Sequence, residues 1–287
     1  MGMLRDRMEA DLKLKGYSPN TQRCYLRCAQ VFAGHYGRSP AVMGEREING
    51  FLIDLLKEKR AAPATHHMYV ASLKFLYAVT LKQPDAVRHV SFPKLPRRLP
   101  EILPGTEVER LLSCITSITY RTMATASYGA GLRITEVRNL RPLDIDSARG
   151  LIHVREGKGR KAREVMLADK LLAMLREYWR VVRPKGEWLF PSPTKPAQPV
   201  SERAMRTALT QAVRAAGIKK RVTPHILRHC FATHLLELGN DVEGIQRLLG
   251  HASMRTTRRY ARVGAEFLRR VKSPLDVVGT PQGAVLR

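Results

Sequence analysis

Acidic residues are scarce in this chain of 287 residues. It holds 25 Asp and Glu against 50 Lys and Arg, which leaves a formal net charge of +25. Such an excess repels itself in a compact body and is usually retained for a polyanionic partner. The composition therefore favours nucleic acid as the partner. An anionic membrane surface is the weaker alternative, because the chain has no basic amphipathic stretch with a Trp or Phe face.

Long apolar runs and paired cysteines are also missing. No run reaches the roughly 18 apolar residues of a transmembrane helix, and residues 1–6 lack the apolar core of a signal peptide. Cys24 and Cys28 are four residues apart, but two ligands do not make a metal site. We interpret these two, with Cys114 and Cys230, as reduced thiols of a cytoplasmic protein.

Helical periodicity dominates the first part of the chain. Over residues 3–80, apolar residues recur at spacings of three and four, which predicts four short helices. Ser18 is expected to cap the second helix, with Pro19 in its first turn. The fourth helix is expected to bury an apolar face formed by Met68, Ala71, Phe75 and Val79. Five prolines then interrupt residues 81–104, which predicts a stiff, basic connector.

The second part mixes helices with short alternating segments. Residues 106–140 are expected to be helical, and residues 143–145, 151–154 and 164–167 read as strands. We therefore predict a mainly α fold with a small antiparallel β-sheet (α+β). The expected divisions are a helical DNA-binding domain (1–82), a proline-rich linker (83–104), a catalytic domain (105–272) and a C-terminal tail (273–287).

Two motifs in the second part could bind an anion. Arg133 and Glu136 are three residues apart in Gly-Leu-Arg-Ile-Thr-Glu, so on a helix the carboxylate can orient the guanidinium. Taken alone, a surface ion pair is the plainer interpretation. The glycine-bounded turn at 156–161 carries Lys158 and Lys161, which could reach a groove or protonate a leaving oxygen. Taken alone, this turn is a solvated hairpin tip.

A helix start near residue 223 could also hold an anion. Thr223 should cap the helix, with Pro224 in its first turn, so that His225 and Arg228 stand one turn apart at the positive end of the helix dipole. For the other histidines of this helix, His229 and His234, we expect buried, hydrogen-bonded structural roles.

The most reactive candidate follows that helix. Gly250 is expected to end a helix over 242–249, which places His251 at a corner. Tyr260 follows among Arg255, Arg258, Arg259 and Arg262. A free phenol has a pKa of about 10, and cations around the phenolate lower it, which makes a tyrosine a usable nucleophile.

Together, and in this order, these motifs resemble the phage-integrase, or tyrosine-recombinase, family. The resemblance covers nearly the whole chain and places the family's catalytic set on Arg133, Lys158, His225, Arg228, His251 and Tyr260. It implies a site-specific recombinase that cleaves and rejoins DNA through a 3′-phosphotyrosyl intermediate. No cofactor and no metal are expected, because the chain has neither an ATP-binding Gly-x-x-x-x-Gly-Lys-Ser/Thr loop nor a carboxylate cluster for magnesium.

The resemblance also implies roles and partners. Arg133 and Arg228 would clamp the phosphate, His225 would act as base or donor, His251 would donate to a phosphate oxygen, and Lys158 (or Lys161) would protonate the leaving oxygen. The expected partners are double-stranded DNA with inverted-repeat arms, held in a C-shaped clamp, and further copies of the chain in a tetramer. The tail is a candidate for docking on a neighbouring copy. No membrane partner is expected, and the expected location is the bacterial cytoplasm.

Three interpretations of the function stay open. A type IB topoisomerase uses a similar tyrosine centre, and an accessory protein could keep the fold without the reaction. Within the family, phage integration, transposon movement, chromosome-dimer resolution and cassette capture share the catalytic set. Residues 190–222 leave little room for the extra segment of integron integrases, which disfavours cassette capture.

Overall fold

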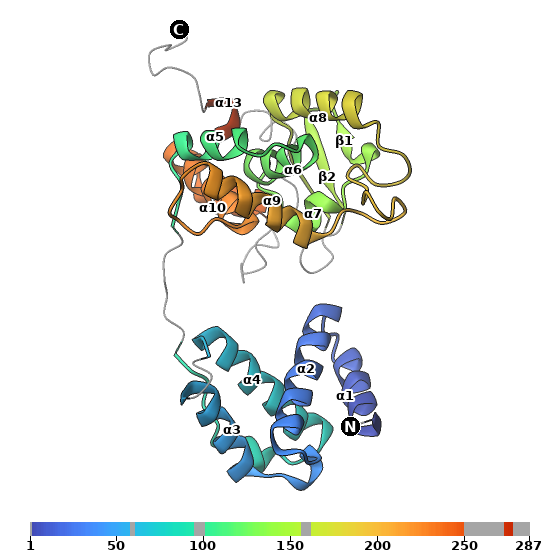
Figure 1. Ribbon diagram of the computed structural model, residues 1–287, viewed down its shortest axis with the longest axis vertical. Helices are drawn as coiled ribbons and strands as arrows, with labels where there is room; N and C mark the ends of the chain where they lie inside the picture. Colours follow the sequence, from blue (N-terminus) through green and yellow to red (C-terminus); the bar gives the residue numbers. More distant parts are fainter. Residues whose placement is uncertain (1, 58–60, 95–100, 156–161, 250–272, 278–287) are drawn as a thin grey trace. The chain divides into compact units, whose positions relative to one another are not determined.

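The computed structural model describes residues 2–57, 61–94, 101–155, 162–249 and 273–277. The chain divides into two compact units, Met1–Arg98 and Leu99–Arg287 (Figure 1). Each unit has its own hydrophobic core.

The first unit is helical. Among its described residues, the helices are α1 (Gly2–Leu14), α2 (Pro19–Tyr36), α3 (Glu45–Lys57) and α4 (Pro63–Phe75), with short turns η1 (Pro40–Val42), η2 (Leu76–Thr80, π-helical) and η3 (Pro84–Val87). As predicted, the Ser18 side chain caps α2 by accepting from the Thr21 N–H, and Pro19 lies in the first turn. Phe32, Phe51 and Tyr77 are fully buried at the centre of this unit.

The buried face of α4 differs from the predicted one. Val70 and Leu73 are fully buried, whereas Met68 is 41% exposed. The prediction was wrong for Met68 because this helix carries apolar residues on more than one side. Its packing against α2 selects the side that is buried. Val87 and Val90, from the stretch expected to be a connector, are buried in the same core.

The second unit confirms the predicted fold class. Its helices are α5 (Gly105–Ser113), α6 (Ile118–Gly129), α7 (Ile134–Arg138), α8 (Asp169–Val182), α9 (Glu202–Ala215), α10 (Pro224–Glu237), α11 (Val242–Leu249) and α13 (Pro274–Val277). After a short turn η4 (Pro142–Asp144), the strands β1 (Ile145–Asp146), β2 (Leu151–Val154) and β3 (Arg163–Met166) form an antiparallel sheet in the order β1-β2-β3.

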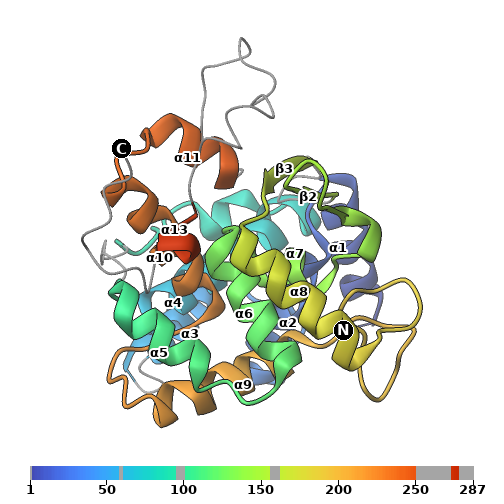
Figure 2. The ribbon, with the colours of Figure 1, turned by 90° about the horizontal axis from the view of Figure 1, so that it is seen from above.

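Helix α6 lies at the centre of the second unit. Every residue from Thr122 to Gly129 is buried, and α8, α9 and α10 all pack against the helix (Figures 1 and 2). A helix that neighbours cover on all sides needs small side chains, and Ala124, Ala126 and Ser127 meet this need. The segment that leaves α6 is consequently held by several elements.

That segment breaks the continuous helix predicted over 106–140. Helix α6 ends at Gly129, Gly131 has a φ of 61°, and α7 begins after Arg133. A Cβ atom at Gly131 would lie 2.5 Å from Phe231 Cδ1 and 3.1 Å from Leu249 Cδ2. Glycine is therefore required here both by the left-handed backbone and by the close approach of α10 and α11.

The described part of the tail packs on its own unit. Ser273 is buried and its hydroxyl donates to the Gly129 carbonyl at 2.8 Å, while Leu275 lies against Gly129. Figure 2 shows α13 beside α10. Residues 278–287 lie outside the described ranges, so docking of the tail on a neighbouring copy stays a prediction. Within the described ranges, no helix has both the length and the apolar character that crossing a membrane requires.

The turn at Gly131 can be tested by substitution. We expect Gly131→Ala to lower the free energy of unfolding by about 2–4 kcal/mol, because backbone strain and overlap with Phe231 add. Gly150→Ala is the matched control: its φ is 68° but nothing lies within 4 Å of the added Cβ, so strain alone should cost about 1 kcal/mol. Urea titration measures both, and equal losses would contradict the packing argument.

Candidate active site

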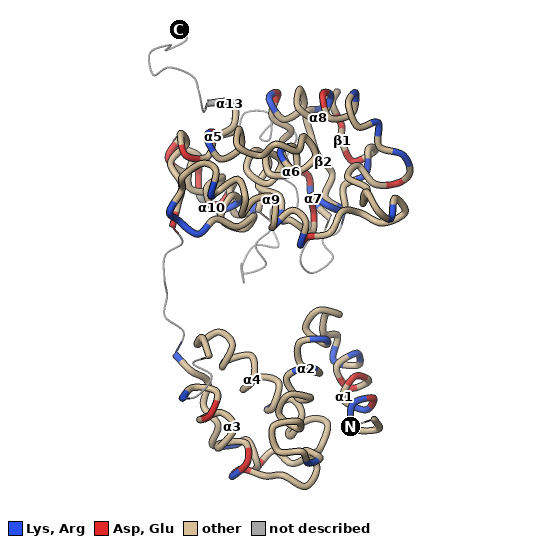
Figure 3. The backbone as a smooth tube through the Cα atoms, in the orientation of Figure 1, with Lys and Arg blue, Asp and Glu red and all other residues tan. Residues whose placement is uncertain are grey.

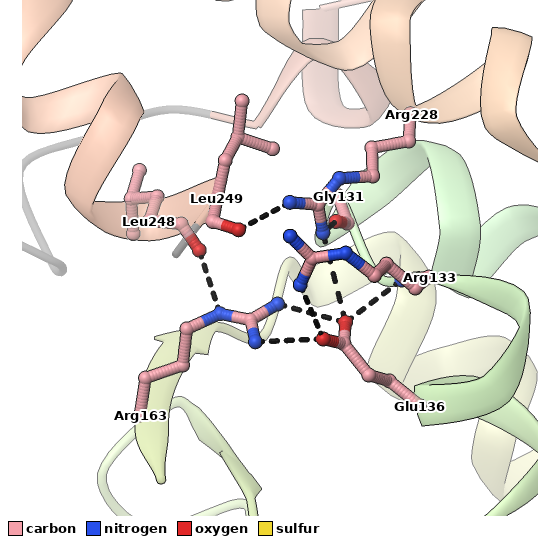
Figure 4. A network of polar contacts seen from close by, with 7 residues as sticks. All are labelled: Gly131, Arg133, Glu136, Arg163, Arg228, Leu248 and Leu249. Carbon is pink, nitrogen blue, oxygen red and sulfur yellow. Dashed lines mark hydrogen bonds and ion pairs between the residues drawn. The ribbon is translucent and has the colours of Figure 1, made fainter. Parts of the chain in front are cut away.

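A buried carboxylate, that of Glu136, is the centre of the candidate site. Its residue is 5% exposed, and three arginines from different elements surround it (Figure 4). Arg133 donates to it twice, from its backbone N–H at 2.8 Å and from Nη1 at 2.7 Å. Arg163 makes a two-pronged pair, with both Nη–O distances 2.8 Å, and Arg228 Nη1 is 3.6 Å away.

These neighbours decide the charge of the carboxylate. Burial by itself raises the pKa of Glu136, since it disfavours the charged form. The hydrogen bonds and positive charge of Arg163, followed by the bonds from Arg133, outweigh burial and lower the pKa to about 2. Glu136 is therefore ionised at neutral pH and can hold the guanidinium groups in place.

Arg228 is almost completely enclosed. Its Nη1 donates to the Gly131 carbonyl and its Nη2 donates to the Leu249 carbonyl. Burial and the nearby charge of Arg133 lower the pKa of Arg228 to about 9, against the opposing effect of Glu136. The guanidinium stays cationic at neutral pH. It has five N–H donors, so two carbonyl contacts leave donors for a further oxygen.

Local sequence signals position the helix that carries Arg228. The Thr223 hydroxyl accepts from the Ile226 N–H and Pro224 occupies the first turn, as predicted. His225 and Arg228 thus stand one turn apart at the start of α10. Backbone N–H groups at this end have no partner within the helix, which favours an anion.

His225 lies at the edge of this arginine group. It is exposed, and its ring meets the half-buried ring of His229 at 4.5 Å between centroids, with the planes at 75°. Partial burial, then His229, Arg228 and Arg133, lower the pKa of His225 below its usual 6.5. Its imidazole is consequently neutral at pH 7 and can accept a proton.

The two histidines expected to be structural differ. His234 is 7% exposed; its Nδ1 is 2.9 Å from the Tyr128 hydroxyl and its Nε2 is 3.0 Å from the Leu103 carbonyl. That arrangement confirms the expectation for His234. His229 is only half-buried, so the expectation that it would be buried was wrong. The cause is its place on the face of α10 that also presents His225.

The structure brings together three of the six candidate residues. Arg133, His225 and Arg228 lie in one group, although no sequence pattern predicted that α7 and α10 would lie close together. Arg133 is the residue just before α7. The prediction that it lies within a long helix was wrong, because Gly131 turns the chain. The other three candidates, Lys158, His251 and Tyr260, lie outside the described residues.

Arg163 was missed by the sequence analysis. It pairs with Glu136, and its Nε donates to the Leu248 carbonyl at 2.9 Å. The pattern that predicted a strand over 164–167 concerns alternating apolar residues, and it contains no signal for a buried ion pair. Only the position of Arg163 in the sequence, just after the predicted turn with Lys158, indicated that it could lie near the site.

The local charge determines what this arrangement can do. Three guanidinium groups share the Glu136 carboxylate, so these four side chains carry a net charge of +2. Donors that are held in place and lie partly out of water stabilise negative charge strongly. The group is suited to a phosphate and to the extra charge of a phosphoryl transition state. Lys and Arg are also spread over both units (Figure 3), as a long polyanion would require.

Comparisons with known proteins agree with this geometry. Residues 101–266 match the phage integrase family, and residues 4–85 match the phage integrase N-terminal SAM-like domain. The integrase/recombinase-type protein y4qK of Sinorhizobium fredii is 42% identical over 98% of this chain and 91% of its own length. Tyrosine recombinase XerA of Pyrococcus furiosus is 37% identical over 90% of this chain and 88% of its own.

Solved structures share the fold. A lambda integrase dimer bound to a COC′ core site aligns with a TM-score of 0.71 at 19% identity, over 88% of this chain and 95% of that one. At this identity the likeness concerns the fold alone. Together, the domain matches and the relatives show that the chain belongs to the phage integrase family. Within that family it is a tyrosine-type site-specific recombinase.

The charge of Glu136 gives a stability prediction. We expect Glu136→Gln to lower the free energy of unfolding at pH 7 by about 3 kcal/mol, because it leaves buried guanidinium groups without their carboxylate. The pKa of Glu136 is lowered from 4.5 to about 2 in the folded protein. The stabilisation is therefore complete above about pH 4.5 and lost as the pH falls toward 2.

Urea denaturation at pH 7 and at pH 3 measures the free energy of unfolding of the original and variant proteins. The difference between the two should be smaller at pH 3. Glu202→Gln is the control, since Glu202 forms an exposed pair with Arg206 and its loss should cost under about 0.5 kcal/mol. An equal difference in unfolding free energy at both pH values would contradict the conclusion that the Glu136 carboxylate is ionised in the folded protein.

Proposed function

We propose that this recombinase cleaves and rejoins duplex DNA through a covalent bond between Tyr260 and a 3′-phosphate, without metal or ATP. The Tyr260 oxygen attacks phosphorus and forms the phosphotyrosyl bond, while the bond from phosphorus to the 5′-oxygen breaks. Tyr260 loses its proton to His225, and the 5′-oxygen gains one from Lys158, or from Lys161. The reverse attack by a 5′-hydroxyl of a partner strand reseals the DNA, so no external energy source is consumed.

The observation that carries this proposal is the cluster of Glu136 with its three arginines. Its net charge of +2 and the neighbouring imidazole of His225 suit a phosphate that gains charge as a nucleophile adds. Arg133 and Arg228 would hold the non-bridging oxygens, because planar forks match two oxygens at once. His251 would donate to one of those oxygens.

The proposed substrate is DNA with inverted-repeat arms, and the proposed active assembly is a tetramer on two such sites. The net charge of +25 supports a long polyanion. Among the solved structures that share the fold, one is a lambda integrase tetramer bound to a Holliday junction.

The nucleophile can be identified with a nicked suicide duplex, in which the cleaved end diffuses away and the covalent adduct accumulates. Duplexes from both borders of the DNA element that carries the coding sequence are suitable, with a randomised duplex pool as a second source. We expect an adduct on a denaturing gel with the original protein and none with Tyr260→Phe. Tyr120→Phe, at a half-buried tyrosine of the same unit, should keep the adduct.

Other results would overturn the proposal in distinct ways. An adduct with Tyr260→Phe would place the nucleophile elsewhere. DNA binding without any adduct would favour an accessory protein, and relaxation of plasmids that lack a specific site would favour a topoisomerase.

The lowered pKa of His225 predicts the pH dependence of cleavage. Since its protonated form is disfavoured in the fold, the rate should rise with pH through an apparent pKa below 6.5 and then level off. His225→Gln should lower the rate by roughly 100-fold and remove this acid limb. His153→Gln, at a half-buried histidine of β2 near Asp146 and Glu164, should keep this pH dependence. Single-turnover rates at subsaturating protein test this, and an unchanged limb in His225→Gln would contradict it.

A further inference from the structure

Arg163 is built into the site without facing a substrate. All three of its guanidinium nitrogens donate to protein oxygens: two to Glu136 and one, Nε, to the Leu248 carbonyl. Its side chain is 11% exposed. A long cationic side chain is enclosed in this way only where its contacts repay the loss of water. We therefore expect Arg163 to act through the groups that it binds, the Glu136 carboxylate and the Leu248 carbonyl.

The contacts of Arg163 join three segments of the chain. It is the first residue of β3, paired with Val154 across the sheet, and the segment 156–161 with Lys158 precedes it closely in the sequence. Glu136 belongs to α7, next to Arg133. Leu248 is near the end of α11, three residues before His251. One side chain thus connects the segments from which several proposed catalytic residues extend.

The shape of the contact matters as much as its charge. A planar fork that meets both carboxylate oxygens fixes the plane of the Glu136 carboxylate, which a single ammonium cannot do. That plane in turn sets where Arg133 donates and how far away Arg228 stays, at 3.6 Å. Without the fork, the carboxylate is held by Arg133 alone, and it can turn toward Arg228 and occupy donors that the phosphate needs.

The third contact acts on the end of α11. Carbonyls in the last turn of a helix have no partner within the helix. Arg163 satisfies that of Leu248, and Arg228 satisfies that of Leu249. Positive charge at this end also favours the helix dipole. Both arginines therefore hold the last turn of α11, which precedes His251 and Tyr260 in the sequence.

We propose that Arg163 is a positioning residue for DNA strand cleavage, which holds the Glu136 carboxylate and the end of α11 in the arrangement that directs the Arg133 and Arg228 forks onto the phosphate. This inference rests on the proposed phosphotyrosyl mechanism. It assigns to Arg163 no contact with DNA.

Arg155 provides a matched control. It directly follows β2, whereas Arg163 begins β3, and its Nε donates to Asp144, a buried carboxylate outside the Glu136 group. Arg155→Lys therefore makes the same chemical change, at the same hairpin, without touching Glu136. Both substitutions keep the positive charge, so a difference between them reports geometry.

The test is single-turnover cleavage of the suicide duplex with saturating protein. We expect Arg163→Lys to cleave roughly 100-fold more slowly than the original chain, because small misplacements of catalytic groups have effects of this size. Its DNA affinity should change by less than about twofold, since no phosphate contact is lost. Arg155→Lys should cleave at about the original rate.

A second substrate separates positioning from a merely structural role. In a methylphosphonate, one non-bridging oxygen is replaced by a methyl group and the scissile group is neutral. Arginine alignment then matters less, so the deficit of Arg163→Lys relative to the original chain should shrink to roughly tenfold or less. A structural defect or a defect at the leaving oxygen would leave the deficit unchanged.

The outcomes are distinguishable. If the original chain forms no adduct, the proposed function fails. If it does, the positioning role fails when Arg163→Lys cleaves normally, loses DNA binding in proportion, or keeps its full deficit on the methylphosphonate. Should Arg163→Lys not fold, Arg163→Gln is compared in the same way; loss of folding in both would make Arg163 a stability residue and overturn the proposal.

Discussion

The second unit depends on keeping one carboxylate ionised in its interior. Glu136 is 5% exposed, and a charge so far from water is tolerated only with close, oriented partners. Arg133, Arg163 and Arg228 are these partners, and they come from segments far apart in the chain. The requirement therefore runs in both directions: the arginines keep Glu136 charged, and Glu136 allows three like charges to lie side by side. Any element that moves one of them disturbs the other three.

The fold meets this requirement through close packing rather than through many polar contacts. Helix α6 is buried from Thr122 to Gly129, so the segment that leaves it starts from a fixed position. Gly131 then turns the chain beneath Phe231 and presents its carbonyl to Arg228. The remaining partners are carbonyls at the end of α11. Because these dipoles are already oriented, little reorganisation is needed when a phosphate adds its charge, which is the usual source of electrostatic catalysis.

Much of the local structure could be predicted because it depends on neighbouring residues. The caps of α2 and α10 at Ser18 and Thr223 follow from side chains that satisfy free N–H groups nearby. The predictions were wrong where contacts between residues far apart in the sequence determine the structure. Met68 is exposed because α2 selects another face of α4, and the long helix predicted through Arg133 is broken where α10 leaves no room for a Cβ at Gly131. The predictions for Lys158, His251 and Tyr260 remain untested.

The sequence by itself determined the charge, the order of the motifs and the type of most local elements, because these follow from composition and short-range periodicity. It therefore identified Arg133, His225 and Arg228 as candidates, and it indicated chemistry on a phosphate. Only the tertiary structure decided that Arg133 and Arg228 converge on Glu136, that His225 lies at the edge of this group, and that Arg163 completes it. The reason is physical: a buried ion pair between β3 and α7 is stabilised by packing that excludes water, and that packing exists only once residues 27 positions apart have been brought together.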